Sequence, residues 1–329
     1  MFTVAGLCGA LSSNAQTNLL EPFTGFYHIE YKPAFKLEAT LTATIASVVG
    51  RIYLPKPRED FNQQDLVVTF RIKGERQAEE PRLGMEESAL RFPVLYFEIH
   101  NKSTVVEAHI RAKMFTRELV AGKPPQPISS LSKKLHDLYT SGSGISMVQN
   151  TEQFRSWIKT HHLTRATDEP DIQFAYRVHE FLRNHLEYGK PATDKWEVDA
   201  IAKCGQADCF GLSRIFVAVL RANRIPSRGL PGRGINDGGT HVKAEFFAEG
   251  VGWVPVEVAG GVSDKHSPLT NYFGKDHADM FVIPNGLDYS FTGPRGAVNV
   301  GSCPHFAVVR SNGTFEFPVG TWTAQRNDF

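Results

Sequence analysis

The chain has 329 residues, enough for two domains of ordinary size, and its 41% of hydrophobic residues can fill a core in each. This composition excludes an intrinsically disordered protein. The 36 basic and 35 acidic residues leave a net charge of +1, so we expect neither nucleic acid nor an anionic membrane as a partner. No stretch approaches the roughly 18 to 20 apolar residues of a membrane-spanning helix.

Residues 1–15 have features of the end of a signal peptide. A short apolar run, Phe2–Leu11, precedes small residues at Ser13 and Ala15, where a signal peptidase could cut, but no basic region comes before the run. Two interpretations stay open. Either a signal that starts upstream is cleaved and the protein is extracytoplasmic, periplasmic or secreted, or this N-terminus frays or docks on the core of a cytoplasmic protein.

Residues 24–120 alternate between apolar and polar positions in short runs separated by turn residues. Such alternation, with many β-branched and aromatic residues, is typical of half-buried strands. We therefore expect a β-sandwich-like domain of about the size of an immunoglobulin domain. The predicted strands are 36–45, 50–54, 66–72, 93–99 and 104–114.

The pattern then changes to helices. Residues 121–170 are predicted to form a linker and two short helices, at 130–139 and 151–160. Apolar residues at helical spacing predict a third helix from about Asp171 that ends before Gly189. A fourth begins at Cys209 and ends near Asn223, because Leu212, Ile215, Phe216, Val219 and Leu220 form one apolar stripe.

Beyond this helix apolar and polar residues again alternate with a period of two. Segments 241–247 and 252–258, joined by a turn at Glu249–Gly250, predict a β-hairpin. A helix followed by antiparallel strands indicates an α+β domain, which we assign to residues 171–329 together with the C-terminal strands. The glycine-rich segment 229–239 predicts a mobile loop, and the acidic side chains of Asp276, Asp279 and Asp288 are expected to be solvated.

The position of Cys209 at the start of the fourth helix affects the chemistry of its thiol. Unpaired backbone N–H groups and the helix dipole favour an anion there, so a thiol at Cys209 is favoured as a nucleophilic thiolate. Such a nucleophile needs an imidazole and a group that orients it. If the hairpin turn centres on Glu249–Gly250, His241 lies opposite Glu257, within reach of a hydrogen bond from Nδ1 to the carboxylate.

These residues resemble the transglutaminase-like superfamily, a group with a papain-like fold. The likeness lies in three blocks that occur in order and at the spacing of the family: 207–228, 240–247 and 252–257. It implies a core in which the helix that carries the cysteine packs on an antiparallel sheet. The β-rich region before it resembles the domain that often precedes this core in bacterial members. The resemblance makes Cys209 the nucleophile, His241 the general base and acid, and Glu257 the orienting carboxylate.

Two positions depart from the family. Glu257 stands where aspartate is usual, and its side chain is one methylene longer. Val242 and Lys243 follow the histidine, where a small residue and then tryptophan are common.

The other cysteines and Gln206 leave several interpretations open. If Cys8 is removed with a signal, Cys204 and Cys303 can form a disulfide while Cys209 stays free, although all three could be buried apolar residues instead. We expect no metal site, because the spacing of Cys204 and Cys209 fits zinc knuckles poorly. Gln206 is a candidate oxyanion donor, and the backbone N–H of Cys209 is the alternative.

The predicted function is thiol-dependent acyl transfer or hydrolysis at an amide or peptide carbonyl, without a cofactor. The resemblance implies a protein, peptide or cell-wall amide as substrate. The alternative is a non-catalytic binding or scaffolding protein that retains the fold. Binding alone would not require both a thiol and an imidazole at this spacing, so catalysis is the hypothesis that we favour.

Overall fold

The computed structural model describes residues 23, 25–45, 50–55, 62–73, 82–85, 93–99, 104–123, 130–141, 151–190, 197–283, 290–293, 296–299, 308–311, 314–316 and 320–329. Residues 1–15, Cys303 and Asp288 lie outside this part of the chain. The predictions for the N-terminal segment and for a disulfide at Cys303 therefore stay predictions.

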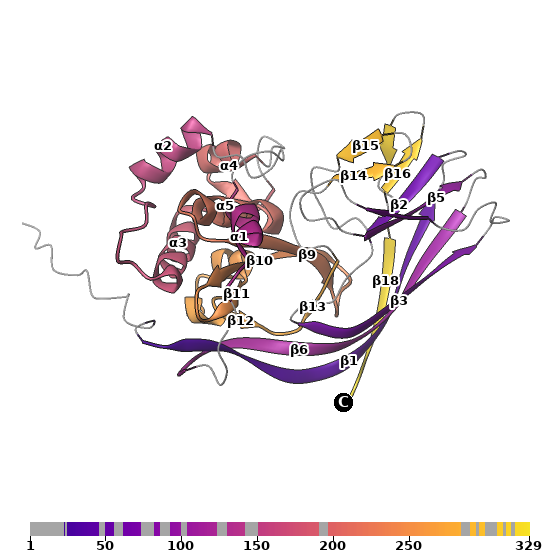
Figure 1. The fold of residues 1–329 in the computed structure, drawn as a ribbon, viewed down its shortest axis with the longest axis horizontal. Coiled ribbons are helices and arrows are strands. Elements are labelled where there is room, and N and C mark those ends of the chain that lie inside the picture. The colour runs from indigo at the N-terminus through magenta and orange to yellow at the C-terminus, as the bar shows by residue number, and fades with distance from the viewer. Residues whose placement is uncertain are drawn as a thin grey trace, which may run out of the picture.

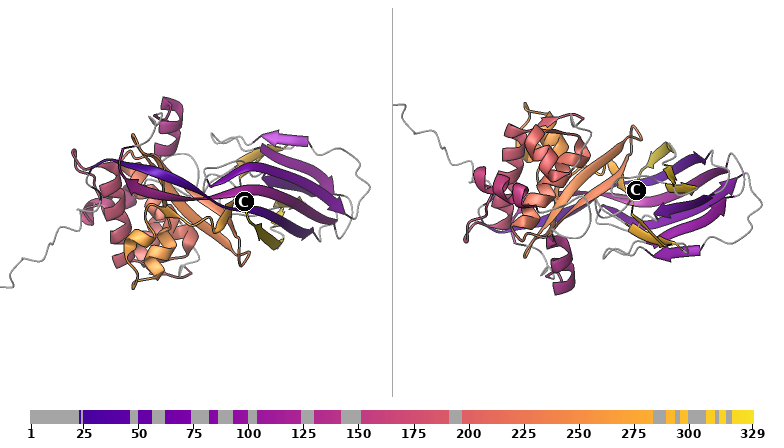
Figure 2. Two further views of the ribbon diagram at one scale, coloured as in Figure 1. Left: turned by 90° about the horizontal axis from the view of Figure 1, so that it is seen from below. Right: turned by 90° about the horizontal axis from the view of Figure 1, so that it is seen from above.

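The molecule is elongated, with its helices gathered at one end and most of its strands at the other (Figure 1). Two long strands, β1 (Tyr27–Ile45) and β6 (Thr104–Ala121), run beneath both ends and join them. The views from above and below show the same two regions along one axis (Figure 2). The helical end and the β-rich end are thus connected by continuous strands as well as by loops.

β1 and β6 form the centre of a five-stranded antiparallel sheet, which we call the long sheet. β18 (Gly320–Asn327) pairs with β1, while β3 (Gln63–Lys73) and β12 (Lys275–Asp276) pair with different parts of β6. One face is apolar because every second residue is buried, as at Leu41 and Ile110, and it packs against Phe281 from the helical end. The long sheet therefore shares a core with the region that carries the candidate site.

A second five-stranded sheet has the order β17-β16-β2-β5-β4. The predicted sandwich packing of this sheet stays a prediction, since its side chains lie outside the described residues.

The C-terminal strands correct our domain assignment: β16 pairs with β2 and β18 pairs with β1, so they belong to the N-terminal sheets and not to the α+β core. These pairings join residues more than 250 positions apart, and alternation within a strand does not indicate its partner. The strands are β2 (Gly50–Pro55), β4 (Arg82–Met85), β5 (Pro93–Ile99), β16 (Val308–Ser311) and β17 (Thr314–Glu316), and a separate pair is β14 (Ser290–Gly293) with β15 (Gly296–Asn299).

The four predicted helices are confirmed, and two short ones were not predicted. α4 is capped at its C-terminal end by Gly205, which has the left-handed conformation that suits glycine (φ 72°), and α6 begins after Glu257. Because each has seven residues or fewer, neither produces a clear periodic pattern. The helices are α1 (Lys133–Thr140), α2 (Glu152–Thr160), α3 (Asp171–His185), α4 (Val198–Cys204), α5 (Cys209–Ala222) and α6 (Val258–Ser263), with a 3₁₀ turn at Leu269–Asn271.

The helices pack on a four-stranded antiparallel sheet with the order β11-β10-β9-β13, which we call the core sheet. Its strands are β9 (Ser227–Gly234), β10 (Thr240–Ala248), β11 (Gly252–Val256) and β13 (Met280–Val282), and two further short strands, β7 (Glu187–Tyr188) and β8 (Gln206–Ala207), form a parallel pair. The prediction of a mobile loop at 229–239 is wrong over residues 229–234. These residues form most of β9, since glycine at 232 lets the backbone of Phe281 approach closely.

α5 is the central helix of this region. Every residue from Phe210 to Leu220 is buried, and the helix contacts α3, α6 and β10. This confirms the predicted α+β, papain-like arrangement, in which the helix that begins at Cys209 packs on an antiparallel sheet.

Candidate active site

Cys209 is the first residue of α5 and is partly exposed. Asp208 caps the helix, because its carboxylate accepts a hydrogen bond of 3.0 Å from the backbone N–H of Gly211. One turn further on, the hydroxyl of the buried Ser213 donates to the carbonyl oxygen of Val242 at 3.0 Å. Val242 follows His241 in β10, so this bond fixes the start of α5 beside the strand that carries the histidine.

His241 lies near the start of β10, and its imidazole is close enough to the thiol of Cys209 for the thiol to raise its pKa. Its Nε2 atom lies 2.9 Å from Oε2 of Glu257. The structure therefore brings all three predicted triad residues together. The contact uses Nε2, whereas we predicted Nδ1.

The hairpin register also differs from the prediction. Ala244 lies opposite Val256, so the turn centres on Gly250 and not on the bond between Glu249 and Gly250. As a result Glu257 follows the last residue of β11 and does not lie directly opposite His241. Its longer side chain still reaches the imidazole.

Glu257 has two structural contacts besides the histidine. It is the residue before α6, and its Oε1 atom accepts a hydrogen bond of 3.3 Å from the backbone N–H of Gly260. Its Oε2 atom lies 3.9 Å from Nζ of the buried Lys243. One carboxylate thus caps a helix through one oxygen and contacts two basic side chains through the other.

Burial opposes the charged form of His241, but the hydrogen bonds with Cys209 and Glu257 and their negative charges outweigh it. Together they raise the pKa of His241 from 6.5 to about 10. The imidazole is therefore protonated at neutral pH. An imidazolium beside a cysteine is the arrangement that favours a reactive thiolate.

Tyr188 is a residue of this site that our sequence analysis missed. It lies in β7 opposite Ala207, two positions before Cys209, and the residue is 51% exposed. Burial and then the negative charges of Cys209 and Asp208 raise its pKa above the usual value. Its place just after the end of α3 was the only signal in the sequence, and that signal is weak.

Gln206 lies in the strand beside β7. Its side-chain amide is packed against Gly189, where a Cβ atom would overlap Nε2. The oxyanion role of Gln206 stays a prediction, as does that of the backbone N–H of Cys209.

Cys204 lies at the end of α4 and is partly exposed. Its sulfur contacts the carbonyl oxygen of Gln206 at 3.2 Å. Because Cys303 lies outside the described residues, a disulfide between the two stays a prediction. Cys204 and Cys209 are both partly exposed, but only Cys209 has the histidine as a partner among the contacts described above.

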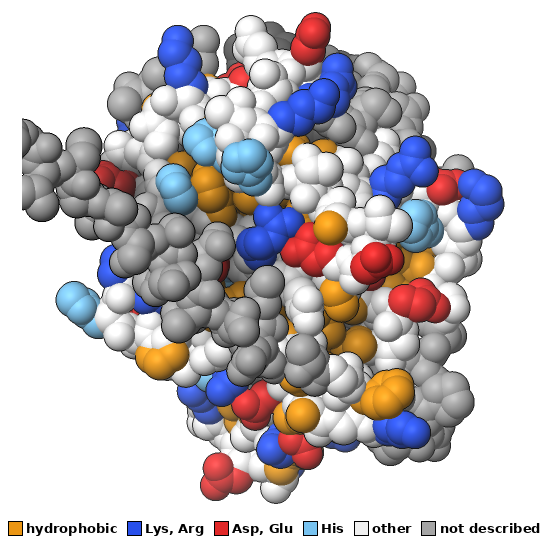
Figure 3. All heavy atoms as spheres, turned by 90° about the vertical axis from the view of Figure 1, so that its left-hand side faces the viewer, with side chains coloured by type: hydrophobic (Ala, Val, Ile, Leu, Met, Phe, Trp, Pro, Cys, Tyr) orange, Lys and Arg blue, Asp and Glu red, His pale blue; other side chains and the backbone are white. Residues whose placement is uncertain are grey.

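Histidines also gather at the helical end of the molecule. Viewed from the side of α2 and α3, the surface shows histidine side chains close to hydrophobic ones (Figure 3). The ring of His161 lies 5.1 Å from that of Phe181 and 6.2 Å from that of His185. Within the described ranges, no group of three or more His, Cys, Asp or Glu side chains is arranged to hold a metal ion.

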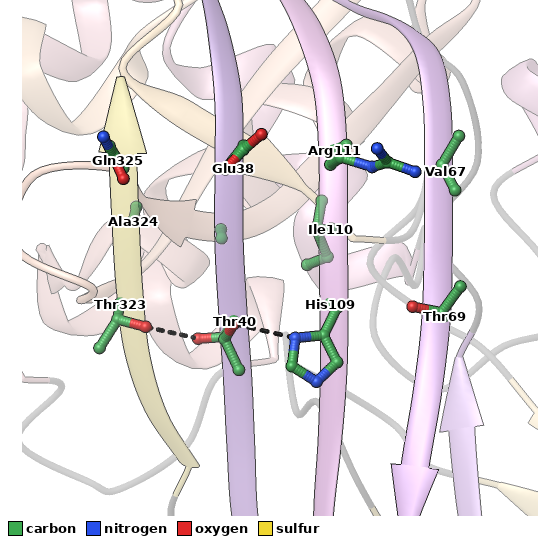
Figure 4. A pocket seen from close by; sticks show the side chains of 11 residues that line it. Glu38, Thr40, Val67, Thr69, His109, Ile110, Arg111, Thr323, Ala324 and Gln325 are labelled. Atoms are coloured by element: carbon green, nitrogen blue, oxygen red, sulfur yellow. Dashed lines mark hydrogen bonds between the residues drawn. The ribbon is translucent and has the colours of Figure 1, made fainter. Parts of the chain in front are cut away.

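A hollow of about 660 Å³ lies on the polar face of the long sheet (Figure 4). Its side chains form rows across four strands, one of which is Thr323, Thr40, His109 and Thr69. None of the triad residues lines it. The hollow is therefore separate from the thiol chemistry of the candidate site.

The sequence model of the transglutaminase-like superfamily matches residues 159–258, a segment that contains all three triad residues. A search of curated proteins found no relative by sequence. The structure of a "putative cysteine protease" from Cytophaga hutchinsonii matches 92% of this chain and 93% of that chain, with 13% identity and a TM-score of 0.56. At this identity the likeness shows a common fold. The periplasmic domain of TgpA from Pseudomonas aeruginosa matches 73% of this chain and 96% of that chain, with 11% identity and a TM-score of 0.36.

Proposed function

From the membership of residues 159–258 in the transglutaminase-like superfamily, we propose that the protein is a thiol-dependent enzyme that acts on an amide or peptide carbonyl group. The observation that carries this proposal is the position of His241 between the sulfur of Cys209 and the carboxylate of Glu257. A nucleophile, a base and an orienting acid in contact form a catalytic triad. The reaction is hydrolysis when water resolves the intermediate and acyl transfer when an amine does.

In the first step the Cys209 sulfur attacks the carbonyl carbon and a tetrahedral oxyanion forms. The carbon–nitrogen bond then breaks, His241 gives its proton to the leaving amine, and a thioester remains on Cys209. A protonated His241 in the resting state suits this step, because the proton donor is in place before the bond breaks.

In the second step His241 must accept a proton from water or from the acceptor amine. The thioester removes the negative charge of Cys209 from beside the imidazole, so the pKa of His241 falls from its resting value. The released proton leaves with the first amine, and the neutral imidazole is then a base. Attack on the thioester carbon restores the thiolate and the imidazolium.

A protein, peptide or cell-wall amide is the substrate class that we propose. An extracytoplasmic location is part of the same proposal, and it rests on the apolar and small residues at 1–15. No helix in the described part of the chain has the length and the apolar character needed to cross a membrane. Sequencing the N-terminus of the native protein tests the location, since an intact Met1 excludes cleavage.

The proposed function is tested by site-resolved alkylation with iodoacetamide, read by mass spectrometry. We expect Cys209 to be labelled faster than Cys204 at pH 6, and the variants His241→Gln and Cys209→Ala to lose this fast labelling. Cys204→Ala is the matched control, because it removes the other partly exposed cysteine of the described residues and should leave the fast labelling intact.

Equal labelling of the two thiols at pH 6 would favour the non-catalytic binding protein. The reaction type is then tested with acyl probes in the presence and absence of a fluorescent primary amine. Incorporation of the amine that depends on Cys209 indicates transfer, and release of the free acid indicates hydrolysis.

A further inference from the structure

Lys243 is a buried lysine beside the candidate active site. It lies two residues after His241 in β10, so both side chains project from the same face of the strand. The side chain of Lys243 is only 6% exposed. A lysine is rarely buried to this extent unless its charge is paired.

Three carboxylates surround the ammonium group. Its Nζ atom contacts Oδ1 of Asp279 and lies 3.4 Å from Oδ1 of Asp276 and 3.9 Å from Oε2 of Glu257. Burial disfavours the charged form, but the three negative charges outweigh it and raise the pKa of Lys243 above its usual range. Lys243 is therefore a cation that touches the proposed catalytic carboxylate.

The position of Lys243 depends in turn on the long sheet. Asp276 is buried, and its Oδ2 atom accepts hydrogen bonds from Nη2 and Nε of Arg117 at 3.0 and 3.3 Å. The strands β12 and β6 pair so that Asp276 lies opposite Arg117. Arg117 also donates to Oε2 of the buried Glu245 at 2.8 Å. Arg117 thus connects a strand outside residues 159–258 to the carboxylates around the site.

The Glu257 side chain needs a further contact, such as the one with Lys243, to hold its orientation. Glutamate has one more rotatable bond than aspartate, and the hydrogen bond that Glu257 accepts from Gly260 is long, at 3.3 Å. Its Oε2 atom faces His241 on one side and Lys243 on the other. A fixed cation at this position restricts the carboxylate to the orientation in which it meets the imidazole.

We propose that Lys243 is a positioning residue, held by Asp276 and Arg117, that keeps the Glu257 carboxylate against His241. The inference deepens the proposed function and rests on it. It makes the alignment of the triad depend on the long sheet, which lies outside the segment that matches the family.

The test is the titration of His241, followed by NMR of histidine labelled with ¹³C in the full chain. The background variant Cys209→Ala removes the coupled titration of the thiol. The signal of His241 among the 12 histidines is the one that disappears in His241→Gln. The partner of His241 that remains is then Glu257, and the groups that act on Glu257 are Lys243, with Asp276 and Asp279 behind it, and Tyr188 from β7.

In this background we expect His241 to titrate above 6.5, and Lys243→Met to lower that value by about one pH unit or more, because Glu257 moves away. Simple loss of a nearby positive charge would raise the value instead. If the role of Lys243 is merely structural, Lys243→Met lowers the stability of the protein and leaves the titration of His241 unchanged. A rise or an unchanged value therefore overturns the proposal.

Lys275→Met is the matched control, since Lys275 lies one residue before Asp276 and makes an exposed ion pair with Glu118. It should leave the titration of His241 unchanged. If Lys243→Met does not fold, Lys243→Met combined with Asp279→Asn removes one cation and the anion that it touches, and the same outcomes apply. The titration needs no substrate, so a protein that shows the expected fall but no reaction with amides contradicts the proposed function alone.

Discussion

The carboxylate of Glu257 lies 2.9 Å from the imidazole of His241, although Glu257 has already left the strand that pairs with β10. The same carboxylate accepts a hydrogen bond from the first turn of α6. Glu257 therefore has an electrostatic role toward the histidine and a capping role toward a helix. Different substitutions separate the two roles.

Glu257→Gln removes the negative charge but keeps an oxygen that can cap α6. The pKa of His241 should fall, because the second of its two negative partners is lost. A fall of one unit in the pKa of His241 weakens its preference for the proton over the thiol of Cys209 by a factor of ten. We therefore expect alkylation of Cys209 by iodoacetamide at pH 7 to slow by about tenfold or more. An unchanged rate would show that the contact with Glu257 does not influence the thiol.

Glu257→Ala removes the charge and the cap together. Loss of a helix cap costs about 0.5 to 2 kcal/mol. We therefore expect Glu257→Ala to be less stable than Glu257→Gln by about 1 kcal/mol in urea denaturation, while both variants show the same slow alkylation. Equal stability of the two variants would contradict the capping role.

The pH dependence of stability should report on His241. Its pKa is about 10 in the folded protein and 6.5 in the reference state, so the folded protein binds this proton more tightly than the unfolded chain. The resulting stabilisation is complete below about pH 6.5 and is lost as the pH rises toward 10. His241→Gln has no such proton.

We therefore expect the difference in the free energy of unfolding between wild type and His241→Gln to be largest at pH 6 and to shrink by pH 10. Urea denaturation at the two pH values measures it. A difference that is the same at both values would mean that the proton on His241 is not bound more tightly in the folded state.

Local patterns in the sequence predicted α5 and the hairpin, since each has a clear apolar period. The register of the hairpin could not be predicted, because it depends on whether the turn centres on Gly250 or beside it. The two departures from the family, Glu257 and Lys243, looked independent in the sequence. In the structure Nζ of Lys243 lies 3.9 Å from Oε2 of Glu257.

The contacts that the sequence could not indicate join distant residues. Asp276 was expected to be solvated, but the structure buries it between Lys243 and Arg117. Acidic residues in a loop-like segment give no sign of a cation more than 150 positions away. The partners of the C-terminal strands were missed for the same reason.

Glu245 offers a test of the buried charges. It is fully buried, and both Arg117 and Arg228 donate hydrogen bonds to its carboxylate. Removal of one member of a buried ion pair costs about 3 to 5 kcal/mol. We expect Glu245→Ala to lower the free energy of unfolding by an amount in this range.

Glu118→Ala is the matched control for Glu245→Ala. Glu118 lies next to Arg117 in β6, and its ion pair with Lys275 is exposed, with 43% of the Glu118 side chain accessible. The expected cost is about 1 kcal/mol or less. If the two variants lose the same stability, burial does not strengthen the Arg117 contact.

Gly232 lies opposite His241 in the core sheet, and on its other side it lies opposite Val282 of β13. A Cβ atom at this position would overlap the backbone carbonyl of Phe281, which cannot rotate away as a flexible side chain could. Gly232→Ala should therefore push β9 and β13 apart, at a cost of about 1 to 3 kcal/mol, and slow the alkylation of Cys209 by shifting His241. Gly239→Ala in the same glycine-rich segment is the control, because an added Cβ would come no closer than 3.4 Å to its nearest neighbour, the Asp237 side chain. Normal stability and normal alkylation in Gly232→Ala would show that the sheet absorbs the added methyl group without moving the histidine.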